Sequence, residues 1–467
     1  MQPPPLTTPL SGDLVLDSFL DTIERATLGR RDEARFILNA IASGHDCAVV
    51  GMSNLGKSSL LRGLFGAAGA RDVDHLWVYV DCNYAAERSS RGFYESVLRG
   101  LVTAAGGPAG APDLRDELAR AYSTVVGPSR GLEDALAFNR SLELVLADNR
   151  QLVLALDEMD GLVPALDGQV FLNLRALKDR YGPHLSYVIG LDRPLGHLRQ
   201  DRDAGEFAEL FNRRTYWLPP LGREAAYAAA RTWGAREGVQ FDEADLDFIR
   251  HYADGHPGLI GAVAVALAEA VGDQPRTTEQ GRVVRRLVSD RLAMDTGVQS
   301  ECDKIWDDVD REDERNALMD LVTGVVPDSA ILYWPRRRHL VIGSDDAPTL
   351  FCQAFTDYVR RKRLGVLPVG SGLRVDVEAG DVFIDGRPIP PLTELEYKLL
   401  MLLYGRANQI VDKYEIVQAV WGQEYIDTVD DGRIERLVGR LREKLEPDQR
   451  NPRFLTTVRG RGYRLLT

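Results

Sequence analysis

Cysteine is scarce in this sequence, with four residues in 467, and no two of them form a CxxC pair. This spacing argues against a zinc site and against a disulfide framework. Long apolar runs are also missing, because the longest mild run, 258–272, contains Glu269 and is shorter than the roughly 20 residues of a membrane span. The opening MQPPPLTTPLSGD lacks the basic and apolar pattern of a signal peptide. We therefore expect a cytoplasmic chain, no membrane segment and a flexible tail over 1–25.

Basic residues are outnumbered by acidic ones, and the chain has a net charge of −13. This balance argues against a protein that coats nucleic acid indiscriminately. The charge is uneven, however, because residues 433–464 contain ten Arg or Lys and four Asp or Glu, a local charge of +6. A segregated basic patch of this kind is typical of a local DNA-binding surface.

The stretch CAVVGMSNLGKSSLL (47–61) places the phosphate-binding pattern GxxxxGK[ST] between a strand pattern and a helix pattern. Glycines let backbone N–H groups converge on phosphate oxygens, and the helix N-terminus adds partial positive charge. Lys57 is expected to reach the β- and γ-phosphates, and the Ser58 hydroxyl to hold Mg²⁺. The pattern predicts a site for ATP or ADP with Mg²⁺, with nucleotide contacts from Gly51, Asn54, Gly56, Lys57, Ser58 and Ser59.

A second apolar run, QLVLALDEMDGL (151–162), places Asp157 and Glu158 at the end of a predicted buried strand. Ligands of open α/β sheets bind at this edge. We expect Asp157 to join Ser58 as a metal ligand, through water, and Glu158 to orient or deprotonate the attacking water. Together with Lys57 these two carboxylates form the predicted catalytic set. The alternative is an acidic turn between a strand and a helix.

Further strand patterns, at 76–82 and 185–191, alternate with helical patterns. This alternation predicts a parallel sheet with helices on both faces. The second run ends just before Asp192 and Arg193, where Arg193 is a candidate sensor of the γ-phosphate. A solvated turn is the alternative at this position.

Two short boxes flank these elements, LGRRDEARFILNAI (28–41) and DGHPGLI (254–260). With the P-loop and the acidic pair, they resemble the STAND class of AAA+-related ATPases over residues 25–365. The resemblance implies that Arg30, in a GRxxE-like box, contributes to the nucleotide site. It also implies that His256, in a GHP-like motif, ties a helical lid to bound ADP, although a helix-capping role is the alternative.

The same resemblance places a candidate arginine finger at Arg213 and Arg214, just before the last strand of the core. A structural arginine pair is the alternative there. The resemblance also divides this part of the chain into a P-loop NTPase core, a helical lid and a small winged-helix-like domain, over 26–220, 221–295 and 296–366.

The last hundred residues follow a different plan. A glycine-containing linker, 367–372, precedes an alternating pattern with a DG turn, which is typical of a small hairpin sheet. In 430–446 basic residues lie on one helical face and apolar residues on another. A closing hairpin over 454–466 carries arginines at a glycine-rich tip. The apolar face of the helical segment consists of Ile434, Leu437, Val438, Leu441 and Leu445.

LTELEYKLLMLL, VWG, VGRLREKLE and TVRGRGYRL together resemble the OmpR/PhoB-type winged helix-turn-helix, an α+β fold, over 367–467. This resemblance implies that the helix with VGRLREKLE enters the major groove of double-stranded DNA. Gly432 and Gly439 weaken that helix, and we expect Gly432 at its start and Gly439 at a close approach. A solvated face is the alternative for an arginine stripe taken alone. The expected DNA contacts are Arg433, Arg436, Arg440, Lys444, Arg459 and Arg461.

Most proteins with this DNA module carry a phosphoacceptor receiver domain before it, and here a nucleotide site takes that place. We therefore expect a bacterial-type transcription regulator in which ATP or ADP controls DNA binding through conformation or self-association. Slow ATP hydrolysis, a homo-oligomer in the ATP state and an unidentified signal ligand or protein belong to this interpretation. The alternatives are an AAA+-like ATPase that remodels or loads factors on DNA, and a defence or scaffold NTPase anchored to DNA.

Overall fold

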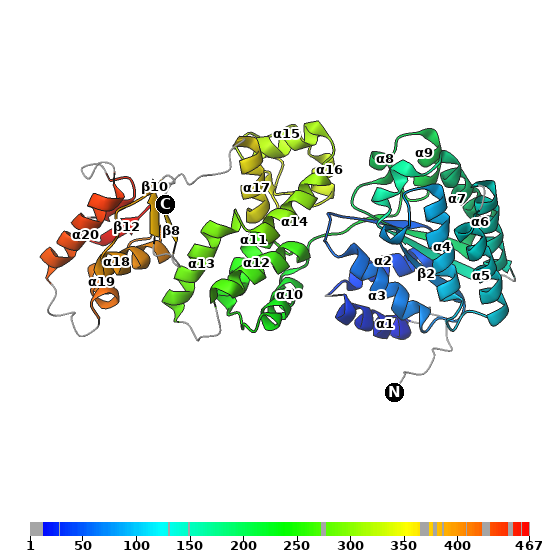
Figure 1. The fold of residues 1–467 in the computed structure, drawn as a ribbon, viewed down its shortest axis with the longest axis horizontal. Helices are drawn as coiled ribbons and strands as arrows, with labels where there is room; N and C mark the ends of the chain where they lie inside the picture. Colours follow the sequence, from blue (N-terminus) through cyan, green and yellow to red (C-terminus); the bar gives the residue numbers. More distant parts are fainter. Residues whose placement is uncertain are drawn as a thin grey trace. The chain divides into compact units, whose positions relative to one another are not determined.

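The structure is a computed structural model. It describes residues 13–27, 29–128, 131–147, 150–271, 277–364, 373–376, 381–384, 387–407, 409–422, 430–446, 452–458 and 460–466. The chain divides into two compact units, whose elements are labelled in Figure 1. The first unit consists of Met1–Ala225, Lys304–Glu314 and Asp328–Asp345, and the second of Ala226–Asp303, Arg315–Pro327 and Asp346–Thr467. Two stretches of the expected winged-helix-like domain thus cluster with the first unit.

A five-stranded sheet forms the core of the first unit. Its strands lie in the order β2-β3-β4-β1-β5, and all neighbouring strands are parallel. The strands β1, β3 and β4 are buried almost throughout, as in parallel sheets covered on both faces. The predicted α/β core is confirmed. The bounds are β1 Cys47–Val50, β2 His75–Asp81, β3 Gln151–Asp157, β4 Leu185–Leu191 and β5 Thr215–Trp217.

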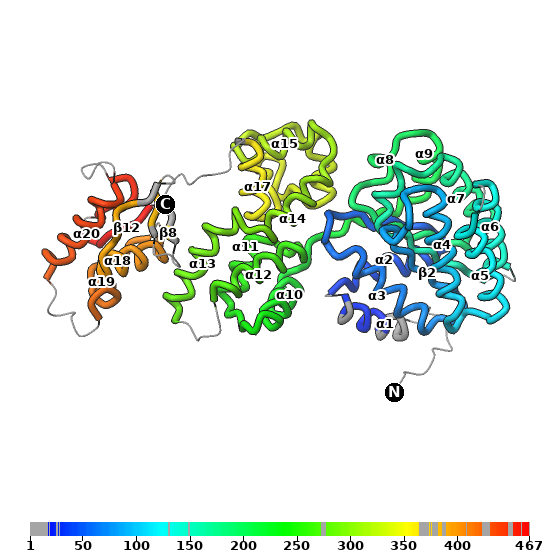
Figure 2. The backbone as a smooth tube through the Cα atoms, viewed as in Figure 1, coloured from blue at the N-terminus to red at the C-terminus, as the bar shows by residue number. Residues whose placement is uncertain are grey.

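Helices follow the strands in alternation and pack around the sheet (Figure 2). Helix α3 follows β1, α4 follows β2, and α7 follows β3. Helices α4, α5 and α6 pack against one another in series. The bounds are α2 Arg31–Ala42, α3 Lys57–Gly69, α4 Ser90–Ala104, α5 Pro112–Val126, α6 Gly131–Val145, α7 Gly168–Tyr181, α8 Leu195–Leu198, α9 Arg202–Ala208, α16 Tyr333–Arg337 and, for a short strand, β6 Val341–Ile342.

Part of the N-terminal segment is helical, which corrects the expectation of a flexible tail over 1–25. Helix α1 spans Asp13–Ala26 and packs against α2 and α3. Its side chains Phe19, Leu20 and Ile23 are at most 1% exposed. Their spacing forms one apolar helix face, and burying that face stabilises the segment.

The second unit begins with helices and continues into a small α+β domain. Helices α11, α12 and α13 pack in series, and α10, α14 and α15 each contain a boundary between the two units. Among the described residues, no helix has the length and apolarity that crossing a bilayer requires. The bounds are α10 Arg223–Arg236, α11 Glu243–Ala253, α12 Pro257–Val271, α13 Thr278–Leu292, α14 Thr296–Asp307, α15 Glu312–Leu321, β7 Thr349–Leu350 and α17 Gln353–Leu364.

The C-terminal part has the predicted hairpins and helices. The strands β8, β9 and β10 form an antiparallel sheet, and β11 pairs with β12 as a hairpin. The five apolar residues predicted on one face of α20 are all buried in a common core with α18 and α19. The expected linker and the DG turn lie outside the described residues. The bounds are β8 Leu373–Asp376, β9 Asp381–Ile384, β10 Arg387–Pro388, α18 Glu394–Gly405, α19 Lys413–Val420, α20 Asp431–Leu445, β11 Leu455–Val458 and β12 Gly462–Leu465.

Candidate functional site

The P-loop connects β1 to α3, and β1 lies between β4 and β5 in the sheet. Gly56 has a φ of 99° and Asn54 a φ of 58°, both in the left-handed region. At Gly51 an added Cβ would lie 3.0 Å from the Leu218 Cβ and 3.0 Å from the Leu55 Cδ2. Conformation therefore favours glycine at Gly56, and close packing favours it at Gly51.

The ammonium group of Lys57 is turned toward the loop. Its Nζ donates to the carbonyl oxygens of Gly51 (3.0 Å) and Met52 (3.1 Å), and it forms an ion pair with Asp192. Burial is the largest single influence and opposes the charge of Lys57, but Asp192, Glu158 and Asp308 together outweigh it and raise the pKa of Lys57 above its ordinary value. Lys57 therefore stays charged in a buried position.

The predicted carboxylates meet Ser58 at the end of β3. The Ser58 hydroxyl donates to Glu158 Oε1 (3.0 Å), and the Tyr79 hydroxyl donates to Asp157 Oδ2 (2.7 Å). Burial is the main cause that raises the pKa of both carboxyl groups. Glu158 has a φ of 57°, which is strained for a residue other than glycine. Asp157 is fully buried, and the metal-binding and base roles of this acidic pair stay predictions.

The donor set at this point fits Mg²⁺. Asp157 Oδ1 is buried and has no hydrogen-bond partner among the described residues. A side chain at Gly190 would clash with this oxygen, so the glycine leaves space for it. Carboxylate and hydroxyl oxygens are suitable ligands for Mg²⁺, which keeps several waters and takes phosphate oxygens. No group of three or more His, Cys, Asp or Glu in the described part of the chain is arranged to hold a metal by itself.

Asp308, which the sequence analysis missed, occupies donors of the P-loop. Its Oδ2 accepts the backbone N–H of Ser53 (2.7 Å), and its Oδ1 accepts the Ser53 hydroxyl (3.0 Å). Burial, with Asp192 as the next cause, raises the pKa of Asp308 to about 7. A carboxylate therefore binds at a loop whose pattern predicts phosphate binding. No local motif marks Asp308, which lies 255 residues from Ser53 in sequence.

Asp160 completes a group of acids around Lys57. Its carboxylate accepts the backbone N–H groups of Asp192 (3.0 Å) and Arg193 (3.3 Å). Burial first, and then repulsion by Asp192, raise the pKa of Asp160 to about 7. Asp160 therefore fixes the end of β4 beside the P-loop. Its position in the sequence, just after Asp157 and Glu158, did not predict this role.

The residues of the two flanking boxes make contacts within the protein. Arg30 is buried and donates to the carbonyl oxygens of Leu55 (2.9 Å) and Pro219 (2.7 Å). Because Leu55 belongs to the P-loop, Arg30 stabilises the loop from within the protein interior. His256 lies in the second unit, is fully buried, and accepts the N–H of Leu259 at Nδ1 (3.2 Å) at the start of α12. This bond corresponds to the capping alternative. Direct contacts of Arg30 and His256 with nucleotide stay predictions.

The remaining candidates surround the loop or the last strand. Arg193 forms an ion pair with Asp310 (3.2 Å). The carbonyl of Arg214 accepts the N–H of Ala48 (3.0 Å), which fixes this turn to β1, and Arg213 is exposed. The roles of these arginines as sensor or finger stay predictions, as do the nucleotide contacts of the exposed residues Asn54 and Ser59.

Helix α20 presents an exposed basic face. The Asp430 side chain caps its N-terminus by accepting the N–H of Arg433 (2.8 Å), so Gly432 lies at the helix start as predicted. At Gly439 an added Cβ would meet no atom within 4 Å, so the expectation of a close approach is wrong. The arginines expected to contact DNA on this helix, Arg433, Arg436 and Arg440, are exposed.

Two basic residues of α20 are tied into the domain. Lys444 donates to Glu396 Oε2 (2.7 Å) and to the carbonyl of Pro391 (2.7 Å), so its expected DNA contact competes with internal bonds. Arg442, which the sequence analysis did not single out, donates to the Leu455 carbonyl (2.8 Å) and the Thr457 hydroxyl (2.7 Å). It therefore joins α20 to the β11–β12 hairpin. Arg461 is exposed at the hairpin tip, and Arg459 lies outside the described residues.

Comparison with known proteins concerns mainly the C-terminal part. Residues 386–465 match the family model "Transcriptional regulatory protein, C terminal". The sensory transduction protein RegX3 of Mycolicibacterium smegmatis is 39% identical over 101 residues, 22% of this chain and 42% of that protein. The DNA-binding transcriptional regulator RpaA of Synechocystis is 45% identical over 72 residues, 15% of this chain and 29% of that protein. The chain thus spans less than half of these relatives, and its C-terminal part is an OmpR/PhoB-type winged-helix DNA-binding domain.

Solved structures also align with the chain. A Walker-type ATPase of Pyrococcus abyssi covers 73% of this chain and 97% of its own at 14% identity, with a TM-score of 0.47. The ORC2 protein of Aeropyrum pernix covers 72% and 95% at 13% identity, with a TM-score of 0.36. The DNA-binding domain of Klebsiella pneumoniae RstA, in complex with the RstA box, covers 21% and 92% at 27% identity, with a TM-score of 0.18. The P-loop core of this chain is defined by its own strand order and loop geometry.

Proposed function

We propose that the chain is a DNA-binding transcription regulator whose nucleotide, ATP or ADP with Mg²⁺, controls its conformation or self-association and hence its binding to promoters. The winged-helix match supports DNA recognition, and the P-loop with its acidic pair supports nucleotide binding. One observation carries the link between the two. The Ser53 N–H, a donor of the P-loop, is bonded to Asp308.

Phosphate and Asp308 compete for the same donor. A nucleotide has to displace this carboxylate or bind with one fewer backbone contact. We propose that displacement moves residues 304–314, which begin within α14, a helix whose residues up to Asp303 belong to the second unit. Two states that differ at Ser53 differ in nucleotide affinity, which is what a ligand-operated switch requires.

The charges around Lys57 also favour two states. Five carboxylates interact with this single ammonium group, and phosphate adds more negative charge to the site. Release of Asp308 and the arrival of Mg²⁺ both lower that excess, so we expect the nucleotide to bind as its Mg²⁺ complex in an opened site. The five carboxylates are those of Asp157, Glu158, Asp160, Asp192 and Asp308.

The contacts of the acidic pair favour slow hydrolysis. The Ser58 hydroxyl keeps its lone pairs for the metal while it donates to Glu158, but Glu158 has to turn away from Ser58 before it orients water. The raised pKa of Glu158 suits a general base, although its strained backbone adds a rearrangement. A site that must rearrange before each turnover suits a switch better than a continuously working motor.

Contacts within the second unit offer a route to the DNA module. Helix α13 of the proposed lid packs against α18 of the winged-helix domain. Arg406, at the end of α18, forms an ion pair with Glu279 of α13 (3.1 Å). We propose that lid movement changes this contact and so the presentation of α20, and that the ATP form assembles as a homo-oligomer on repeated half-sites. The STAND class remains the proposed subfamily.

DNA binding in defined nucleotide states tests this function. The full chain is used to select duplex sites from a random library, and its affinity for them is then measured with ADP, with a non-hydrolysable ATP analogue, and without nucleotide. We expect different affinities in the three states, and no difference for Lys57→Ala. Equal affinity in all states, with the protein monomeric throughout, would refute the switch. Rapid continuous hydrolysis would favour the remodelling ATPase, and binding without sequence preference the scaffold NTPase.

A further inference from the structure

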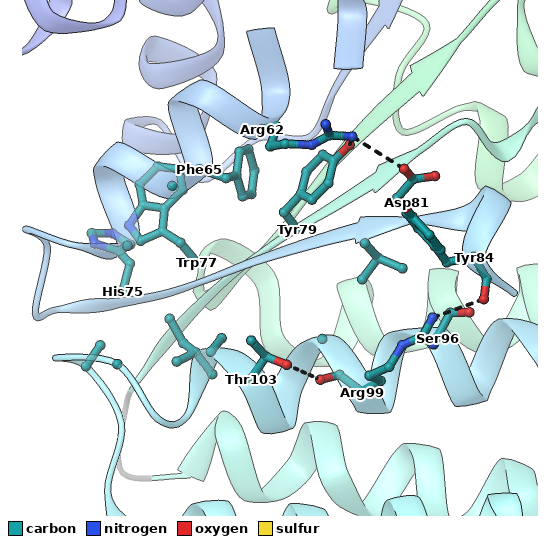
Figure 3. Close-up of a pocket in the computed structure, with 18 residues that line it drawn as sticks. Arg62, Phe65, His75, Trp77, Tyr79, Asp81, Tyr84, Ser96, Arg99 and Thr103 are labelled. Carbon is teal, nitrogen blue, oxygen red and sulfur yellow. Dashed lines mark hydrogen bonds and ion pairs between the residues drawn. The ribbon is translucent and has the colours of Figure 1, made fainter. Parts of the chain in front are cut away.

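A cavity of about 720 Å³ lies at the open edge of the sheet in the first unit. The edge strand β2 lies between helices α3 and α4, and all three line the cavity (Figure 3). The P-loop residues 51–56 do not belong to its lining, so it is separate from the nucleotide site. Its volume lies within the range of about 300–1,000 Å³ that is usual for small-molecule sites.

Glycines on the two flanking helices shape this cavity in different ways. An added Cβ at Gly66 of α3 would meet no atom within 4 Å, so a larger side chain there would enter the open space. At Gly100 of α4, an added Cβ would lie 3.0 Å from Val78 Cγ1 and 3.0 Å from Val80 Cγ2. Gly66 therefore keeps the cavity open, whereas Gly100 lets α4 approach the strand.

Aromatic side chains form the apolar part of the cavity. Phe65 and Trp77 are buried and pack edge to face, with ring centroids 5.1 Å apart. Tyr79 continues this wall along β2, and Tyr84 lies beyond Asp81 with 71% of its surface exposed. A wall of this kind suits the flat or branched apolar body of a small ligand.

Two guanidinium groups, those of Arg62 and Arg99, outnumber the one carboxylate of the lining, that of Asp81. The Arg62 side chain is 63% exposed, and its contacts with the Tyr79 hydroxyl and with Asp81 are both long, at 3.5 Å. The Arg99 side chain is 44% exposed and donates to the Tyr84 carbonyl at 3.1 Å. Figure 3 shows these arginines on opposite sides of β2. Guanidinium groups match carboxylates in shape and charge, so the cavity fits an acid better than a neutral molecule.

Tyr79 connects this cavity to the nucleotide site. Its ring lines the cavity, and its hydroxyl donates to Asp157 Oδ2, the carboxylate expected to hold Mg²⁺. Arg62 lies over the same ring, 5.6 Å from its centroid, on the helix that begins with Lys57. A ligand that draws Arg62 away from Tyr79 therefore changes the support of Asp157.

We propose that this cavity is an effector site for a small aromatic or branched carboxylic acid, coupled to the nucleotide site through the hydrogen bond from Tyr79 to Asp157. Binding of the acid stands on the cavity alone, whereas the coupling rests on the proposed nucleotide function. Because coupling is reciprocal, the acid and the nucleotide change each other's affinity by the same factor.

Calorimetric titration of the full chain with 2-naphthoate and with indole-3-acetate tests the binding. We expect saturable binding of at least one acid with one site per chain, and at least about tenfold weaker binding of the neutral 2-naphthylmethanol. Gly66→Leu fills the space and should abolish binding. Gly205→Leu is the matched control, because Gly205 is also an exposed helical glycine with no atom within 4 Å of an added Cβ, outside the cavity.

Arg62→Met keeps the apolar stem of the side chain and removes its charge, so this variant should bind the acid weakly. It tests the proposal independently if Gly66→Leu folds poorly. Failure of both acids to bind the wild-type chain overturns the proposal. Unchanged binding in folded Gly66→Leu, checked by circular dichroism, overturns it as well.

The coupling is measured as the affinity for a fluorescent ADP analogue with and without the acid. We expect a change of at least about fivefold in the wild-type chain. Tyr79→Phe keeps the ring and loses the hydroxyl, so it should still bind the acid but lose the change. Coupling that survives in Tyr79→Phe refutes the connection through Tyr79. A chain that binds no ADP contradicts the proposed function instead, while the calorimetric result for the acid stands independently.

Discussion

Replacing Asp308 by asparagine removes a charge from the P-loop and keeps the shape of the side chain. Burial and the nearby Asp192 raise the pKa of Asp308 from 3.8 to about 7. Below about pH 4 the carboxyl is protonated in both the folded and the unfolded chain, and it has little effect on stability. Between about pH 4 and pH 7 the unfolded chain loses this proton first, so the folded state becomes less stable as the pH rises.

A difference of about three in pKa corresponds to about 4 kcal/mol in the free energy of unfolding at pH 8. This is an upper value, because Asp160 also has a pKa of about 7 and shares Asp192 as a neighbour. Asp308→Asn should therefore raise the melting temperature at pH 8 and leave it nearly unchanged at pH 4. Thermal unfolding followed by circular dichroism checks this expectation, with Asp307→Asn as the control at an exposed neighbouring position.

The same substitution should strengthen nucleotide binding. An amide oxygen still accepts the Ser53 N–H, but it lacks the charge of Asp308, and a charge-assisted hydrogen bond contributes about 1.5–3 kcal/mol. We expect Asp308→Asn to bind a fluorescent ADP analogue about tenfold more tightly, or better, at pH 8. Wild-type affinity should increase from pH 8 to pH 6, as Asp308 takes up its proton, and the variant should show a smaller increase. Equal affinities of Asp308→Asn and Asp307→Asn at pH 8 would refute the competition between carboxylate and phosphate.

Four further outcomes are expected. Glu158→Gln should keep ATP binding and lose hydrolysis, as measured by phosphate release, and unchanged turnover would exclude Glu158 as the base. Arg461→Ala should lower the salt dependence of DNA binding by about one in slope for every sequence, in titrations over a salt series. Arg436→Ala should cost about 1–3 kcal/mol and relax preference at one base pair, and a uniform loss over all sequences would make it a phosphate contact. Leu437→Ala should destabilise the winged-helix domain by about 2–5 kcal/mol in denaturant unfolding, because Leu437 is 1% exposed in its core, and a loss below 1 kcal/mol would contradict that placement.

Local patterns were sufficient where structure depends on neighbours in sequence. The P-loop follows from glycine conformation and from its place between a strand and a helix, and the structure has both. The buried face of α20 follows from helical periodicity, and all five of its predicted residues lie in the core. The prediction of a flexible tail over 1–25 was wrong for α1. The proline-rich pattern covers only the start of that segment, and the residues of α1 have an apolar helix face of their own.

Tertiary packing alone decided the contacts that distinguish this site. Asp308 meets Ser53 across 255 residues, Tyr79 meets Asp157 across 78, and Lys444 meets Glu396 across 48. Periodicity and spacing report which face of an element is apolar, but not which distant side chain will fill a given position beside it. The charge of Asp308 depends further on how deeply it is buried and how near Asp192 lies. Burial and distance of this kind exist only in the folded chain, so the sequence specified a phosphate-binding loop, and the fold decided that a carboxylate occupies its donors.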